Sequence, residues 1–136
     1  MSIIEWSDEL SVGIASIDKQ HQILIELINS LNTAMAEGEA NLRIADILAS
    51  LTSYTRLHFA YEEKLFEKHG YAETKEHKRQ HGELIEQINA LKERFESDQS
   101  GSIGLEIMQF LKNWLTNHIM KTDKHYSAFL LSKGVV

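Results

Sequence analysis

Apolar positions recur every three or four residues along four long stretches of the chain, which is the spacing of amphipathic α-helices. We predict helices at about 17–37, 41–69, 72–96 and 103–132. Clusters of turn residues separate them, namely Gly38, the pair His69 and Gly70, and the segment 97–102. The 136 residues include no proline, and this composition favours long helices without interruption.

Short connections between successive long helices force each helix to run antiparallel to the one before it. We therefore expect an all-α fold, an up-down-up-down antiparallel four-helix bundle that occupies residues 1–136 as a single domain. Residues 1–16 contain Trp6, Val12 and Ile14 but lack helical periodicity. They are expected to form an extended N-terminal arm packed on the bundle.

Polar side chains interrupt the apolar stripes of all four predicted helices at one height. His21 lies about 18 residues before the first turn and His58 about 19 after it, so at about 1.5 Å per residue both reach the same level. Counting residues from the second and third turns places the other polar side chains at the same level. The layer contains these candidate metal ligands: His21, His58, Glu62, His77, His81, His118 and Asp123.

Two pairs in this layer have a spacing of four residues, which places both side chains on one helix face. They are His58 with Glu62, and His77 with His81. Either pair alone is more often two solvated or hydrogen-bonded side chains than a metal site. Their convergence inside an apolar bundle favours a bound cation, because buried imidazoles and carboxylates need partners.

The number and type of donors restrict the kind of site. Seven ligand residues are too many for one tetrahedral zinc ion, whereas they suit two metals. The chain has no cysteine, so zinc sites, iron–sulfur clusters and haem groups that are held by cysteine thiolates are excluded. Imidazole and carboxylate donors leave iron, manganese, zinc and nickel open at this point.

The spacing of His118 and Asp123 does not fit a regular helix. Residues five apart lie about 140° from each other around the helix axis, so both can point inward only where the helix is widened. We expect a π-type bulge at about 120–122.

The net charge and the hydropathy of the chain limit its possible partners and compartment. Fourteen Lys and Arg against 20 Asp and Glu give a net charge of −6, which argues against nucleic acid as a partner. No apolar run approaches the length of a membrane-spanning helix, so membrane insertion is not expected. The acidic residues Glu5, Asp8 and Glu9 do not suit a secretory signal, and the expected compartment is the cytoplasm.

The motifs together resemble the hemerythrins, in particular the single-domain bacterial ones. The resemblance rests on Trp6, Val12-Gly13-Ile14, Asp18-Lys19-Gln20-His21, His58-x-x-x-Glu62, His77-x-x-x-His81 and His118-x-x-x-x-Asp123. It implies a non-haem centre of two iron ions per chain, bridged by Glu62, Asp123 and an oxo or hydroxo group. It also implies reversible O2 binding, for carriage or storage, rather than an enzymatic activity.

The resemblance further assigns individual roles. His77, His81 and His118 would hold an iron with no free position, and His21 and His58 would hold the iron that binds O2. The O2 pocket would be lined by Leu24, Phe59, Trp114, Leu115 and Ile119. A protein that receives the O2 is not specified.

Two other functions compete with O2 carriage. An O2 or redox sensor would need a signalling domain or long linker, for which this chain offers no sequence. A di-iron oxidase is less favoured, since such sites carry Glu-x-x-His motifs and no histidine here has Glu three residues before it. Outside the layer, His69 and His125 are expected not to bind metal, and Glu63 is expected to be solvated.

Overall fold

The computed structural model describes residues 4–38, 41–97, 103–118 and 123–135. Helices dominate the described residues, which contain no β-strand, so the predicted all-α class is confirmed. The helices are α1 (Ala15–Ala36), α2 (Asn41–His69), α3 (Thr74–Ser97), α4 (Ile103–Asn117) and α5 (Lys124–Ser132). No helix within these ranges is long and apolar enough to cross a membrane.

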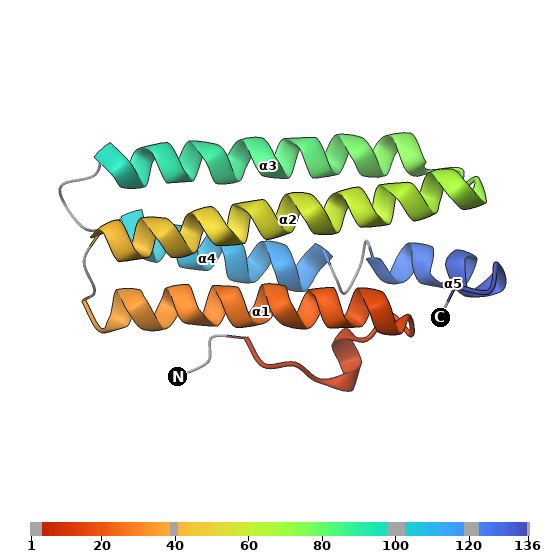
Figure 1. The fold of residues 1–136 in the computed structure, drawn as a ribbon, viewed down its shortest axis with the longest axis horizontal. Coiled ribbons are helices and arrows are strands. Elements are labelled where there is room, and N and C mark those ends of the chain that lie inside the picture. Colours follow the sequence, from red (N-terminus) through yellow and green to blue (C-terminus); the bar gives the residue numbers. More distant parts are fainter. Residues whose placement is uncertain (1–3, 39–40, 98–102, 119–122, 136) are drawn as a thin grey trace.

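Successive long helices run in alternating directions (Figure 1). α1 packs on α2, α2 packs on α3, and α4 contacts both α3 and α1. α5 follows α4 along the same side of the molecule, beyond the segment 119–122 (Figure 1). The helix predicted over 103–132 thus corresponds to two described α-helices, one on each side of that segment.

The end of α2 shows how a local signal sets a helix boundary. Gly70 has a φ of +70°, a left-handed conformation that glycine adopts without steric cost. The Tyr71 N–H then donates to the Phe66 carbonyl at 2.9 Å, and the two rings lie 5.0 Å apart. This is a Schellman ending with its hydrophobic contact, and it reverses the chain into α3.

The N-terminal segment, which is predicted to be extended, contains a helical turn in the structure. Residues Asp8–Leu10 form the 3-10 turn η1, and α1 begins at Ala15. The Ile4 backbone exchanges two hydrogen bonds with the Asn29 side chain, at 3.2 and 2.9 Å. These bonds hold the segment alongside α1 (Figure 1).

The apolar core is divided along the length of the helices. One cluster includes Leu24 on α1, Leu51 on α2 and Leu115 on α4. A separate cluster contains Ile17 and Phe66, with Val12, Ile14, Tyr126 and Leu130 completing it. On α1 and α2 these clusters lie on either side of His21, His58 and Glu62, so a polar layer separates the two apolar regions.

Candidate metal centre

The structure brings the polar residues of the predicted layer together in the interior. His21 comes from α1, His58 and Glu62 from α2, and His77 and His81 from α3. His118 follows the last residue of α4, and Asp123 precedes α5. All seven side chains are at most 7% exposed.

Two groups within this layer are compact enough to hold a metal ion. One donor atom from each of His21, His58, Glu62 and Asp123 lies within 4.8 Å of the others. The same holds for Glu62, His81 and His118. The two groups share Glu62, which therefore lies between two possible cation positions.

His77 lies beside these groups without belonging to either. Its ring centre is 5.5 Å from that of His81 and 6.4 Å from that of His118. Its Nε2 is buried. The ring also packs against Phe66 and Tyr126, at 4.9 and 5.5 Å.

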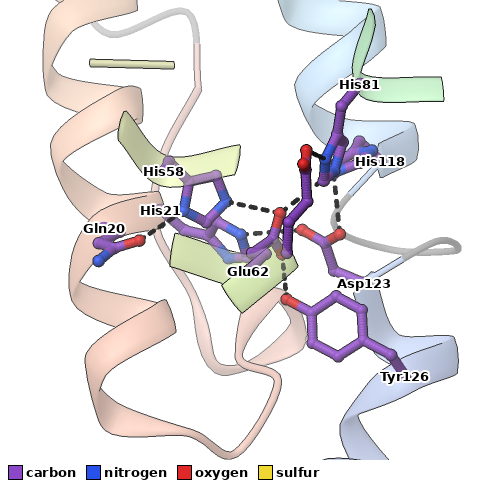
Figure 2. A network of polar contacts seen from close by, with 9 residues as sticks. Gln20, His21, His58, Glu62, His81, His118, Asp123 and Tyr126 are labelled. Carbon is purple, nitrogen blue, oxygen red and sulfur yellow. Dashed lines mark hydrogen bonds and ion pairs between the residues drawn. The ribbon is translucent and has the colours of Figure 1, made fainter. Parts of the chain in front are cut away.

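Each carboxylate faces histidines from different helices. Asp123 Oδ1 lies 2.8 Å from His118 Nε2, and its Oδ2 lies 2.9 Å from His21 Nε2. Glu62 Oε1 lies 3.4 Å from both His58 Nε2 and His81 Nε2 (Figure 2). Both carboxylates are thus placed to join the two halves of the cluster.

The hydrogen bonding of the cluster tests whether a cation fits. Nine buried side-chain N and O atoms in the described part of the chain have no hydrogen-bond partner. Every one of them belongs to the seven predicted ligand residues. Some of these atoms lie within 3 Å of one another, but their geometry does not make hydrogen bonds. Buried donors and acceptors left unpaired are costly, and bound cations would satisfy most of them. The donor set therefore fits a metal centre.

The charges of the cluster are set mainly by burial and by mutual contact. Burial lowers the pKa of His58 to about 4, which keeps this imidazole neutral. Burial alone would raise the pKa of Asp123, but His118 and His21 outweigh it and hold that pKa well below its usual range. Neutral imidazoles and ionised carboxylates are the forms that bind metals.

Three residues at the site were not identified from the sequence. Gln20 Oε1 lies 2.6 Å from His58 Nδ1, and Glu63 Oε2 lies 2.8 Å from His81 Nδ1. The Tyr126 hydroxyl donates to Glu62 Oε2, and burial raises the pKa of this phenol well above its ordinary value (Figure 2). Only Tyr126 carried a signal, since it lies three residues after Asp123 on the same helical face.

The expectation that Glu63 is simply solvated is wrong. Its side chain is 26% exposed, and its carboxylate contacts the His81 ring on the adjacent helix. The sequence placed Glu63 next to an inward-facing residue, but α2 is rotated so that Glu63 faces α3. His125 is 69% exposed and pairs with Glu73 at 3.1 Å, away from the cluster.

Of the residues that the resemblance assigns to the O2 pocket, Phe59 and Trp114 contact histidines of the cluster. Leu24, Phe59 and Leu115 are buried, and Trp114 is partly buried. The Phe59 ring stacks on His81 at 3.8 Å, and the Trp114 ring stacks on His118 at 5.5 Å. Ile119 and the expected bulge at 120–122 lie outside the described residues, although His118 and Asp123 on either side are π-helical.

Residues 12–130 match the family model of the hemerythrin HHE cation binding domain. The chain belongs to the hemerythrin family. The bacteriohemerythrin of Pseudomonas aeruginosa is 36% identical over 126 residues, covering 93% of this chain and 80% of that protein. The bacteriohemerythrin of Methylococcus capsulatus is 30% identical over 131 residues, covering 96% of this chain and 98% of that protein.

The fold agrees with the hemerythrin family. A crystal structure of wild-type hemerythrin superposes with a TM-score of 0.83 at 29% identity, covering 95% of this chain and 98% of the other. The likeness therefore extends over the helices that carry the buried cluster.

Proposed function

We propose that this hemerythrin-family chain binds O2 reversibly, as a carrier or store, at a non-haem di-iron centre. One observation carries the proposal: all nine buried polar atoms without hydrogen-bond partners among the described residues belong to one internal cluster of five histidines and two carboxylates. Family membership favours iron over the other metals that such donors accept. The chain's role is then ligand binding rather than catalysis, with the cytoplasm as the proposed compartment.

The two halves of the cluster suggest how its residues are shared. His77, His81 and His118 would hold one iron, and His21 and His58 the other. Glu62 and Asp123 would bridge, since each contacts histidines of both halves. With fewer histidines around it, the iron held by His21 and His58 would leave room for O2. The bound iron pair would supply the reversible redox chemistry.

The surrounding residues have separate tasks in this proposal. Leu24, Phe59 and Leu115 exclude water from the cluster. The protonated Tyr126 phenol holds one oxygen of Glu62 and so orients this carboxylate. For the fold, we propose that α4 and α5 together form the fourth helix of an up-down-up-down four-helix bundle that covers residues 1–136.

The proposal predicts two irons per chain after expression in iron-replete medium. His77→Ala should lose iron, because it removes a proposed ligand, whereas the exposed His125→Ala should keep the parent's content. Iron analysis measures the content, and visible spectra of the reduced protein with and without air report O2 binding. One zinc per chain, or equal iron in His77→Ala and the parent, would contradict the proposed centre.

A sensor role is the second candidate, because the same centre could report O2 to a partner. A helix rearrangement on O2 binding would favour the sensor role over carriage. Hydrogen exchange of the reduced protein, with and without O2, measures that difference.

A further inference from the structure

Two histidines of the cluster have their outer ring nitrogens held by side chains of different charge. His58 Nδ1 contacts the amide oxygen of Gln20 at 2.6 Å. His81 Nδ1 contacts the carboxylate of Glu63 at 2.8 Å. Both partners present oxygen acceptors, so each Nδ1 carries the hydrogen and donates it.

These contacts fix the tautomer of both rings. With Nδ1 protonated, the lone pair of each neutral imidazole is on Nε2. Both Nε2 atoms are buried and lie 3.4 Å from the same oxygen of Glu62 (Figure 2). Gln20 and Glu63 therefore aim two lone pairs at the centre from opposite sides.

The two partners differ in what they do to the ring. A carboxylate accepting from Nδ1–H makes the imidazole a stronger electron donor through Nε2, whereas a neutral amide does so weakly. Glu63 is partly exposed to water, which solvates its negative charge. The Phe59 ring, stacked within 3° of parallel on His81, holds the imidazole in the plane that this contact requires.

We propose that Glu63 is a positioning residue that makes His81 a stronger donor than His58, so that the two halves of the centre are electronically unequal. This inference rests on the proposed function. The half that contains His81 then binds its metal more tightly and favours the oxidised state. The half that contains His58, proposed to bind O2, remains the weaker donor because its partner is the neutral Gln20.

A purely structural role for Glu63 makes a different prediction. If Glu63 served only to tie α2 to α3, its loss would weaken the metal-free fold and leave the properties of a loaded centre unchanged. Those helices are also joined by an exposed ion pair between Glu67 and Lys78. Glu67, one turn after Glu63 on α2, therefore supplies a matched control.

The test compares Glu63→Gln, Gln20→Glu and the control Glu67→Gln. Glu63→Gln keeps the side-chain length and an acceptor oxygen but removes the charge, and Gln20→Glu adds a charge at the other histidine. The measurements are iron retention against a chelator, the midpoint potential of the iron-loaded protein, and the melting temperature of the metal-free chain.

Glu63→Gln should release iron about 10-fold more readily and show a higher midpoint potential. Gln20→Glu should show a lower midpoint potential, and Glu67→Gln should match the parent in both measurements. Opposite shifts at the two positions are not expected from a structural contact.

An iron-loaded Glu63→Gln protein with the parent's potential and iron retention would overturn the inference while leaving the proposed di-iron centre intact. A variant that alters only the melting of the metal-free chain would overturn it as well. A parent protein that takes up no iron would refute the proposed function itself, and this inference with it.

Discussion

At the residue scale, the cluster consists of side chains that an apolar interior would otherwise exclude. Burying an imidazole or a carboxylate without a partner costs several kcal/mol. His21, Glu62 and Asp123 are nevertheless completely buried. A chain that serves only as a structural scaffold gains nothing from this arrangement, whereas one that binds a cation recovers the cost.

Leu24 allows a direct test of how the apolar wall protects the centre. It is fully buried and lies three residues after His21, on the same face of α1. Leu24→Gln introduces an amide that can recruit water and donate hydrogen bonds near the proposed O2 position. We expect the oxygenated form to decay faster to the ferric form, with a steeper increase at low pH, in stopped-flow mixing with O2.

The matched control for Leu24→Gln is Leu31→Gln. Leu31 is also fully buried on α1, two turns further from His21, so the general cost of a buried amide is similar. Equal decay rates in Leu24→Gln and the parent would show that the dryness of the wall does not protect bound O2.

At the scale of elements, the segment before α1 is fastened to the first turn of that helix. Asp18 accepts hydrogen bonds from the Val12 N–H at 2.8 Å and from the Ser11 hydroxyl at 2.5 Å. Val12 and Ile14 consequently pack in the same apolar cluster as Tyr126. One carboxylate on α1 thus supports the helix that positions a partner of Glu62.

Asp18→Ala removes both of these hydrogen bonds. We expect the free energy of unfolding to fall by about 1–3 kcal/mol, because hydrogen bonds to a charged group are lost. The exposed Glu26→Ala on the same helix should have little effect. Denaturant unfolding measures the free energy, and hydrogen exchange at the Val12 amide reports local release. Unchanged exchange at Val12 would show that Asp18 does not hold the segment.

At the scale of the whole molecule, the polar layer divides the apolar core. Clusters containing Leu24 and Ile17 lie on either side of His21 along α1. A metal bound between four helical rods would join the two regions, and its binding free energy would add to the stability of the fold. The stability of the metal-free chain should depend on pH, because buried histidines of the layer have shifted pKa values in the folded state.

The pH dependence follows from His58, whose pKa is lowered by burial from 6.5 to about 4. Between these values the unfolded chain binds a proton that the folded chain does not. The free energy of unfolding of the metal-free protein should therefore fall as pH falls from 6.5 to 4, by up to about 3 kcal/mol from this group.

The raised pKa of His118, where Asp123 outweighs the opposing effect of burial, acts in the other direction. Its stabilisation is present below pH 6.5 and is lost as pH rises above that value. Denaturant unfolding at several pH values should therefore compare the parent with His58→Gln, in which the His118 effect remains. A flatter profile in His58→Gln is expected, and identical profiles would show that His58 does not titrate as described.

The sequence by itself determined the first three long helices and the height of the polar layer. Helical periodicity and turn signals depend only on residues close together in the chain. The pair His69 and Gly70 therefore predicted the end of α2 correctly. The rise per residue then places His21 and His58 at the same level, whatever the details of packing. Local rules were sufficient for both results.

Only the tertiary structure decided which side chains hold the histidines from outside. Gln20 reaches His58 on another helix, and Glu63 reaches His81 across the contact between α2 and α3. Such contacts depend on how far each helix is rotated about its axis and how closely it approaches its neighbour. Both quantities result from the packing of the whole core, so the pattern of apolar positions along the chain does not predict them.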